Sequence, residues 1–509
     1  MASNRPGEVV SIDPRSGEVA EVVAPETTTE EVARLCEAAL AAAPALEGMG
    51  RQGRAALLRA LADALEARRE DVVAVADRET ALGTTRLNGE LNRTSYQLRL
   101  FAEVLEEGSY LEATIDHPGD TPMGPRPDLR RMLVPLGPVA VFGSSNFPLA
   151  FSVPGGDTAS ALAAGCPVVL KAHSSHPATS RLVFDVLVEA ARKAGAPEGT
   201  LGIVFGQRAG GALVAHPAIR AAGFTGSVGG GRALLQIIEQ RPDPIPFFGE
   251  LSSLNPVVVT PSAAAERGEQ IGRELVGSFT LGAGQFCTKP GLVLVPAGTE
   301  GDAVVDAMAE AVRGSSPQVL LNKGIAASYD RIAGGLADAP GVEVVARGED
   351  ADGPGFTAVP QLLSTTAAEL PAEVTEECFG PVSVVARYDG ERELFGALDA
   401  MPSSLTATVL RGTEETDLPL AVSQQLRTRA GRLVYDAYPT GVAVSWAQHH
   451  GGPWPSTNSQ HTSVGTSAIR RFLRPVTWQG APQEVLPEEL TDGYTAIPRR
   501  IDGVLELPR

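Results

Sequence analysis

The residues with the clearest chemical potential are a cysteine in a glycine-rich turn and a glutamate upstream of it. Cys287 lies in the segment Gly-Ala-Gly-Gln-Phe-Cys-Thr, whose small residues leave backbone N–H groups free and leave room for a substrate carbon. A thiolate in such a turn can attack a carbonyl carbon and hold the product as a thioester. The carboxylate of Glu250 can take a proton from the water that releases this thioester. The pair predicts an enzyme that oxidises aldehydes.

An apolar segment leads into the glutamate. Residues 244–249 read Pro-Ile-Pro-Phe-Phe-Gly, so we expect the Glu250 side chain to be partly buried. Burial disfavours the charged form of a carboxyl group, so we also expect a raised pKa for Glu250, which suits a general base. The other cysteines, Cys36, Cys166 and Cys378, are widely scattered and are expected to be buried structural thiols.

Short apolar stretches alternate with helical ones around these residues. The alternation begins near residue 137 and continues to the glutamate, and a second set runs from about 270 to 440. Such alternation is typical of parallel βαβ units, so we predict two α/β domains with the nucleophile between them. Amphipathic helices are expected over about 28–110, and residues 115–130, rich in Pro, Gly and Asp, predict a loop or an excursion.

Composition narrows the class of protein. The 509 residues suffice for two or three domains, and 43% hydrophobic and 20% charged residues are ordinary values for a soluble enzyme. A net charge of −19, with no block of lysine and arginine, argues against nucleic acid or membrane as a partner. Residues 1–6 show no apolar signal stretch, and no run approaches the roughly 18 apolar residues of a membrane span. With no CxxC pair, we expect a cytoplasmic protein without a metal site.

A glycine-rich turn offers a phosphate site. Residues 226–231, Gly-Ser-Val-Gly-Gly-Gly, follow an apolar strand and open a helix, where free N–H groups and the helix dipole favour a phosphate. The segment is neither the GxGxxG fingerprint nor a Walker loop, so a kinase or an ATPase loses support.

Five motifs, taken in order, resemble the aldehyde dehydrogenase superfamily over nearly the whole chain. They are Asn146-Phe147-Pro148, Phe224-Thr225-Gly226-Ser227, Glu250-Leu251, Gly284-Gln285-Phe286-Cys287 and Glu377-Cys378-Phe379-Gly380-Pro381. Residues 144–152, 171–177, 450–455, 462–465 and 474–476 look like the NADP-dependent 2-oxoglutarate semialdehyde (2,5-dioxopentanoate) dehydrogenase branch. That branch also resembles NADP-dependent long-chain aldehyde dehydrogenases, so a fatty aldehyde stays open as the substrate.

The resemblance implies a role for each matched residue. Cys287 would form a thiohemiacetal, with the side-chain amide of Asn146 aimed at the developing oxyanion, and Glu250 would activate the hydrolytic water. His450 matches a histidine near the nucleophile, although His449 beside it leaves that assignment open. The implied cofactor residues are Lys171, Ser174, Arg208, Gly226, Ser227, Gly231, Glu377 and Phe379.

The implied cofactor is NADP rather than NAD. Many NAD-preferring relatives carry a glutamate at the position of Ser174, and its charge would repel a 2′-phosphate. Lys171, Ser174 and Arg208 can instead clamp that phosphate. Glu377 matches the residue that holds the nicotinamide ribose, and Phe379 flanks it. One departure is Ser252-Ser253, where relatives usually have two glycines, which puts the mobility of the base in doubt.

A 2-oxo-dicarboxylic semialdehyde needs a cation for its far carboxylate. Arg86 and Arg93 lie seven residues apart and share one face of a helix, and Arg93 is the predicted partner. Phe147, Phe286 and Trp454 are predicted pocket walls.

Two other activities of Cys287 stay open. A CoA-acylating enzyme would release the thioester with a thiol, but relatives of that type usually lack the base at Glu250. A non-redox cysteine hydrolase would pair the thiol with His450, but it would leave the cluster of Lys171, Ser174 and Arg208 unexplained.

The resemblance also implies an architecture, namely a Rossmann-type cofactor domain, an α/β catalytic domain and a small β extension. The cofactor domain would comprise residues 1–120 and 138–251, with 445–468 returning to it, the catalytic domain 252–444, and the β oligomerisation segments 121–137 and 469–509. Relatives pair a segment like 471–479 with a second subunit, so a homodimer or a homotetramer is expected.

Overall fold

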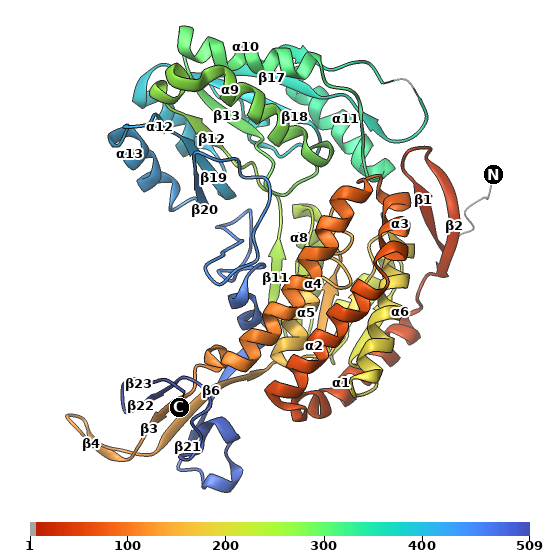
Figure 1. Ribbon diagram of the computed structural model, residues 1–509, viewed down its shortest axis with the longest axis vertical. Coiled ribbons are helices and arrows are strands. Elements are labelled where there is room, and N and C mark those ends of the chain that lie inside the picture. The colour runs from red at the N-terminus through yellow and green to blue at the C-terminus, as the bar shows by residue number, and fades with distance from the viewer. Residues whose placement is uncertain (1–6, 352, 509) are drawn as a thin grey trace.

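Two α/β lobes and a smaller β arm make up the molecule in a computed structural model that describes residues 7–351 and 353–508 (Figure 1). Residues 1–6, where we expected no signal stretch, lie outside the described residues. Among the described residues, no helix combines the length and the apolar character needed to cross a membrane.

The first lobe is built on a five-stranded parallel sheet in the order β11-β10-β7-β8-β9. Its strands are short and mostly buried, as expected for a parallel sheet that helices cover on both faces. They are β7 (Val139–Phe142), β8 (Val168–Lys171), β9 (Leu201–Val204), β10 (Ala221–Thr225) and β11 (Phe247–Glu250). The helices between them are α5 (Gly156–Ala164), α6 (Pro177–Lys193), α7 (Gln207–Ala215) and α8 (Val228–Glu239).

Four N-terminal helices belong to this lobe, as the amphipathic runs predict. They are α1 (Thr29–Gly48), α2 (Gly50–Ala67), α3 (Arg69–Thr80) and α4 (Thr84–Glu107). Helix α1 contacts strands of the sheet, and the other three pack on α5 and α6. Thr28 and Glu31 form a capping box that starts α1. A hairpin of β1 (Glu8–Asp13) and β2 (Glu18–Pro25) precedes them and contacts α3 and α6.

The second lobe contains a seven-stranded sheet in the order β15-β17-β18-β13-β12-β19-β20, parallel except for β15. Its strands are β12 (Val257–Val259), β13 (Leu292–Pro296), β15 (Glu343–Arg347), β17 (Gln361–Thr366), β18 (Val382–Tyr388), β19 (Ser404–Leu410) and β20 (Ala430–Tyr435). The helices are α9 (Pro261–Thr280), α10 (Thr299–Arg313), α11 (Lys323–Ala337), α12 (Gly390–Ala400) and α13 (Asp417–Leu426). A separate two-stranded sheet pairs β14 (Gln318–Val319) with β16 (Thr357–Ala358).

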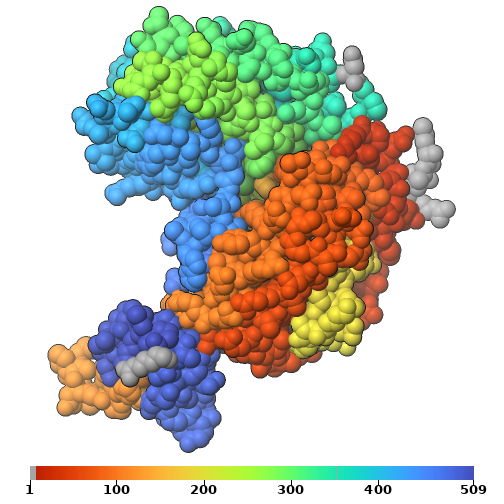
Figure 2. Space-filling view, viewed as in Figure 1, coloured from red at the N-terminus to blue at the C-terminus, as the bar shows by residue number. Residues whose placement is uncertain are grey.

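The β arm projects from the first lobe, on the side away from the second lobe (Figure 2). It contains a sheet in the order β21-β6-β3-β22-β23 and a separate hairpin, β4–β5. Its strands are β3 (Thr114–Asp116), β4 (Gly119–Thr121), β5 (Gly124–Arg126), β6 (Leu129–Pro135), β21 (Leu473–Gln479), β22 (Arg499–Ile501) and β23 (Val504–Glu506). Residues 115–130, where we expected a loop or an excursion, belong to this projecting arm and form strands over most of that span rather than a loop. The polar and glycine residues there form short strands, which propensity alone does not detect.

Candidate active site

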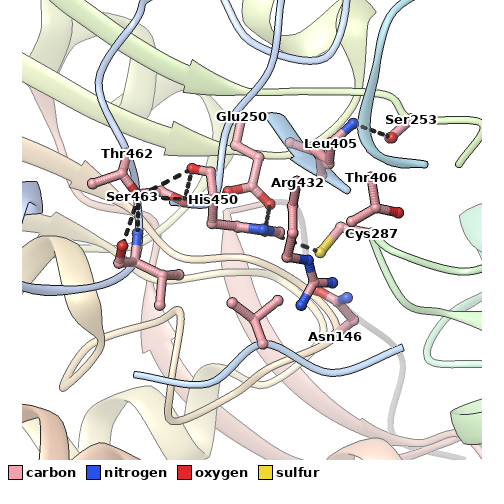
Figure 3. Close-up of polar contacts among 12 residues, drawn as sticks. Asn146, Glu250, Ser253, Cys287, Leu405, Thr406, Arg432, His450, Thr462 and Ser463 are labelled. Carbon is pink, nitrogen blue, oxygen red and sulfur yellow. Dashed lines mark hydrogen bonds and ion pairs between the residues drawn. The ribbon is translucent and has the colours of Figure 1, made fainter. Parts of the chain in front are cut away.

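Four of the residues singled out from the sequence come together between the lobes (Figure 3). Asn146 follows β7, and Glu250 ends β11, so both lie where strands of the first sheet reach their carboxyl ends. Cys287 lies in the loop between α9 and β13 of the second lobe, and His450 lies in the long segment after β20. The site is thus assembled from parts of the chain that are far apart in sequence.

A chain of polar contacts runs through the cysteine, the histidine and the glutamate. The Nε2 atom of His450 lies 3.6 Å from the sulfur of Cys287 and 2.9 Å from Oε1 of Glu250. The hydroxyl of Ser463 donates to the other oxygen of Glu250 at 2.5 Å. An ionised carboxylate only accepts, so Nε2 of His450 carries the proton in this contact. Of the two adjacent histidines, His450 is therefore the one that faces the nucleophile.

The pKa of Glu250 differs from the sequence prediction. Burial is the largest influence on this group and raises its pKa, as expected for a side chain that is 2% exposed. The interaction with His450 and hydrogen bonds from His450, Ser463 and the Cys287 thiol outweigh burial, so the net pKa lies below the ordinary value. The prediction of a raised pKa was wrong because these donors are distant in sequence. Glu250 is an ionised acceptor already engaged with the thiol.

The pKa of the Cys287 thiol is shifted in the opposite direction, upward. Burial raises the pKa of its thiol well above the ordinary value, and the negative charges of Glu250 and Glu377 raise it further, while Arg432 opposes them. The thiol therefore keeps its proton at neutral pH in this arrangement, and the adjacent Glu250 carboxylate is the group placed to accept it.

Replacing Glu250 with glutamine is expected to shift the alkylation of Cys287 to lower pH. Removing the carboxylate charge lowers the pKa of the thiol, so a larger thiolate fraction reacts at neutral pH. The rate of iodoacetamide labelling of Cys287, followed by peptide mass spectrometry from pH 6 to 10, measures the shift. Ser463→Ala keeps the Glu250 charge and serves as the control, with an expected profile near that of the unmodified protein. An unchanged profile in Glu250→Gln would contradict the electrostatic link.

The turn that carries the cysteine is fixed by left-handed residues and by an asparagine. Gly282 and Gly284 have φ values of +58° and +66°, and a Cβ at Gly284 would lie 2.2 Å from the backbone of Gly380. The Nδ2 atom of Asn255 donates to the carbonyl of Cys287 at 2.8 Å. The Cys287 N–H has no hydrogen-bond partner within residues 7–351 and 353–508. It is therefore available to a developing oxyanion.

Asn146 lies against the same turn. Its Nδ2 atom donates to the carbonyl of Gln285 at 2.8 Å, which leaves one N–H of the amide for a substrate oxygen. The carbonyl of Asn146 accepts from Nη2 of Arg86 at 2.7 Å, and the same guanidinium lies over the rings of Phe147 and Phe286 at 5.0 and 4.7 Å. Arg86 thus links the loop of Asn146 to the loop of the cysteine.

Aromatic side chains and one arginine cluster beside the loop of the cysteine. The rings of Phe147 and Phe286 are 5.3 Å apart, Phe147 contacts Phe151 at 5.2 Å, and Phe151 lies 6.5 Å from the His450 ring. The guanidinium of Arg93 lies over Phe151 at 4.9 Å. Its Nη1 and Nη2 atoms are buried and have no hydrogen-bond partner among the described residues. A buried guanidinium fork without a hydrogen-bond acceptor is costly.

The structure places Trp454 elsewhere. Its side chain is 45% exposed and lies over the guanidinium of Arg232 at 5.4 Å, in a separate hollow that His449 also lines. The contacts of Trp454 thus differ from those of Phe147 and Phe286, the other two predicted pocket walls.

A second cavity, of about 510 Å³, opens at the carboxyl ends of β8, β9 and β10. Lys171, Ser174, Gly226 and Ser227 line it, and Ser227 caps α8 by accepting from the N–H of Gly230. Burial lowers the pKa of Lys171, and no carboxylate of the described residues lies within ion-pair distance of its ammonium. A strand-end cavity with a helix N-terminus and an unpaired ammonium fits a dinucleotide phosphate.

The remaining predicted cofactor residues are not among those that line this cavity. Gly231 is inside α8, where a Cβ would lie 2.5 Å from the side chain of Leu251. Arg208 is 86% exposed on its side chain and forms an ion pair with Glu26. Glu377 and Phe379 are partly buried in the loop before β18. Burial raises the pKa of Glu377 to about 7, against the hydrogen bonds from Ser252 and Ser253.

The cluster of Glu250, Cys287 and His450 has a donor set that zinc also uses, with all ligand atoms within 4.8 Å of one another. Tetrahedral zinc with bonds of about 2.0 Å would hold a nitrogen and an oxygen ligand ~3.3 Å apart. The observed separation between His450 and Glu250 is 2.9 Å. That distance fits a shared proton better than a shared metal ion.

Comparison with known proteins identifies the family of this chain. The model of the aldehyde dehydrogenase family matches residues 1–477. The chain belongs to the aldehyde dehydrogenase family. The family and fold suggested by the motifs are thereby confirmed, and proteins of this family oxidise aldehydes with NAD(P).

Two relatives of this aldehyde dehydrogenase resemble it over almost their whole length. One, the alpha-ketoglutaric semialdehyde dehydrogenase of Acinetobacter baylyi, is 43% identical over 94% of this chain and 92% of the relative. Another, alpha-ketoglutaric semialdehyde dehydrogenase 2 of Azospirillum brasilense, is 45% identical over 98% of this chain and 97% of the relative. Among solved structures, aldehyde dehydrogenase C of Pseudomonas syringae, in complex with NAD+ and octanal, superimposes with a TM-score of 0.79 at 22% identity and 95% coverage of both chains.

Several residues of the site escaped the reading of the sequence. Local sequence patterns assign no role to Ser463, Asn255 or Arg432, because their contacts with the site form only in the folded chain. Lys289, two residues after the nucleophile, is buried and donates from Nζ to the carbonyls of Cys378 and Val382 at 2.9 and 2.8 Å. A lysine so close to the nucleophilic cysteine was the one signal that the sequence offered.

Proposed function

We propose that this aldehyde dehydrogenase oxidises 2-oxoglutarate semialdehyde to 2-oxoglutarate, with NADP as the preferred cofactor. Both relatives described above carry the name of that activity, at 43% and 45% identity. The structural observation that carries the substrate assignment is the unpartnered guanidinium fork of Arg93 beside the aromatic wall that leads to Cys287. An apolar long-chain aldehyde would leave that fork buried without an acceptor.

The contacts suggest which residue acts in each step of the reaction. Glu250 accepts the proton of the Cys287 thiol, and the thiolate attacks the aldehyde carbon to give a thiohemiacetal. The Cys287 N–H and the free N–H of Asn146 stabilise the oxyanion, each contributing about 3–4 kcal/mol to lowering the barrier. Bound nicotinamide cofactor supplies the hydride acceptor that converts this adduct into a thioester. After the thiol proton has passed from Glu250 to solvent, its carboxylate takes a proton from water, and the resulting hydroxide attacks the thioester and releases the acid with Cys287 as the leaving thiolate.

His450 and Ser463 hold the carboxylate of Glu250 in place for both proton transfers. Their hydrogen bonds keep its pKa low, so Glu250 is ionised when the thiol and later the water approach. Because this base is present, hydrolysis is favoured over release of the acyl group to CoA.

The proposal of NADP rests on the cavity at the ends of β8 and β9. Lys171 and Ser174 line it, and neither carries the negative charge that would repel a 2′-phosphate. Arg208 begins the adjacent helix α7 and completes a set of groups able to bind the phosphate.

A comparison of four initial rates tests the function. The pure protein is assayed for NADPH and NADH formation with 2-oxoglutarate semialdehyde and with pentanal, an uncharged aldehyde of the same chain length. We expect the highest kcat/KM with the semialdehyde and NADP, by at least about tenfold, or 1.4 kcal/mol of transition-state binding. A higher value for pentanal or for a long-chain aldehyde would replace the proposal with a fatty-aldehyde activity.

Arg93→Met is expected to lower kcat/KM for the semialdehyde by about 10- to 100-fold, because a hydrogen-bonded charge contact of this kind contributes about 1.5–3 kcal/mol. The value for pentanal should change little. Arg99→Met is the control, because Arg99 lies on the same helix but pairs with Asp63 at the surface. An equal loss for both aldehydes in Arg93→Met would assign this residue to folding instead of substrate binding.

We also propose that the β arm mediates self-association into a dimer or tetramer. One of its two edge strands is β21, which covers most of the expected pairing segment 471–479, and the other, β23, carries exposed Val504 and Leu505, followed by exposed Leu507. An edge strand with exposed apolar side chains is suited to pairing with a second chain.

A further inference from the structure

The contact between Glu26 and Arg208 lies beside the β9–α7 turn, whose residues Gly206 and Gln207 line the proposed cofactor cavity. Glu26 directly follows β2, and its carboxylate lies at the start of α7. Its Oε1 atom accepts from the backbone N–H of Arg208 at 3.3 Å, and Oε2 accepts from Nε and Nη2 of that residue at 3.2 and 2.7 Å. The carboxylate thus binds the helix N-terminus and one edge of the guanidinium at the same time.

The surrounding backbone directs Glu26 over this helix start. Thr27 N–H donates to the carbonyl of Phe205 at 2.9 Å, and Phe205 N–H donates to the Thr27 hydroxyl at 2.8 Å, which fixes the end of β2 beside the β9–α7 turn. Gly206 has a φ of +96°, and a Cβ there would lie 2.1 Å from Cγ of Glu26. The Glu26 side chain therefore occupies the space directly above the turn.

That turn also borders the cofactor cavity. Gly206 and Gln207, the two residues before Arg208, line the cavity together with Lys171 and Ser174. A phosphate that entered from the cavity toward Arg208 would need the same donors that Glu26 now uses, namely helix N–H groups and a guanidinium edge. Two anions cannot share these donors without strong repulsion.

We propose that Glu26 is a cofactor-selecting residue whose carboxylate competes with the 2′-phosphate of NADP for Arg208 and the start of α7. The inference rests on the proposed use of NADP, and it identifies Glu26 as a group that weakens the binding of NADP. NADP binds Arg208 only by displacing Glu26, whereas NAD lacks the 2′-phosphate and leaves the contact intact. The ion pair is exposed on the arginine side, so displacement is feasible. Glu26 thus sets how strongly the protein prefers NADP over NAD.

Glu26→Gln tests the competition by direct binding, without substrate. The dissociation constants of NADP+ and NAD+ are measured by titration calorimetry on the full chain. We expect NADP+ to bind about five- to tenfold more tightly in the variant, because a competing and repelling charge is lost, and NAD+ to bind within about twofold of the unmodified protein. Unchanged NADP+ binding, weaker NADP+ binding, or an equal shift for both cofactors would overturn the inference.

Two further variants test whether the change in NADP+ affinity is specific to the contact between Glu26 and Arg208. Glu21→Gln is the matched control, because this exposed glutamate of β2 pairs with Arg78, and neither cofactor's affinity should change. In Glu26→Gln combined with Arg208→Gln, the gain for NADP+ should disappear. A gain of full size in that double variant would show that Arg208 is not the contested group and would overturn the inference. If the unmodified protein binds NAD+ better than NADP+, the proposed cofactor is wrong, while the response of Glu26→Gln still decides the competition.

Discussion

Replacing Cys287 with alanine is expected to abolish aldehyde oxidation, with a loss of roughly 10⁴-fold or more in kcat, because no other group can form the covalent adduct. The other three cysteines are buried away from the contacts of Glu250 and His450, so none can substitute. Steady-state NADPH formation measures the loss. Titration calorimetry should show NADP+ binding close to that of the unmodified protein, because the cofactor cavity lies at the ends of β8 to β10.

The control for this prediction is Cys36→Ala. Cys36 is a buried thiol in α1, and its replacement should leave the rate nearly unchanged. Oxidation that persists in Cys287→Ala, or that is lost to the same extent in Cys36→Ala, would contradict the assignment of the nucleophile.

Replacing Glu250 with glutamine is expected to separate the two halves of the reaction. The thioester should form in a burst of about one NADPH per chain, because loss of the carboxylate charge lowers the pKa of Cys287 and so favours the attacking thiolate. Turnover should then fall by about 10²–10⁴-fold, because no base remains to activate water. Stopped-flow absorbance records the burst and the steady state in one experiment.

Hydroxylamine provides a control for the Glu250→Gln experiment, since this nucleophile attacks a thioester without a general base. Its addition should restore turnover in the variant and change the unmodified protein little. An undiminished steady-state rate in Glu250→Gln would rule out Glu250 as the base for hydrolysis.

The sequence was most informative where local chemistry and spacing define a structure. Cys287 could be recognised from its glycine-rich turn, and Glu250 from its place after an apolar strand. The alternation of short apolar strands with helices predicted two α/β lobes, because a parallel sheet covered on both faces imposes that pattern. The five ordered motifs indicated the aldehyde dehydrogenase family, and the comparisons confirm that family.

The sequence was least informative where two distant segments meet. His450 lies 200 residues from Glu250, and Ser463 lies 213 residues from it, so the hydrogen bonds that lower the pKa of Glu250 could not be foreseen. The pairing of Glu26 with Arg208, 182 residues apart, was missed for the same reason. Burial could be inferred from neighbouring residues, but the partners of a buried charge are set by tertiary packing.

The most direct test of the account is to trap the acyl group on the protein. Glu250→Gln is mixed with NADP+ and 2-oxoglutarate semialdehyde, quenched in acid after one burst, digested and examined by peptide mass spectrometry. We predict that the peptide containing Cys287 carries one acyl group derived from the semialdehyde, in an amount matching the NADPH formed. NADPH formation with Cys287 unmodified, or an acyl group on another residue, would contradict the proposed mechanism. Absence of both NADPH and the acyl group would contradict the proposed substrate, provided that the unmodified protein also fails to oxidise it.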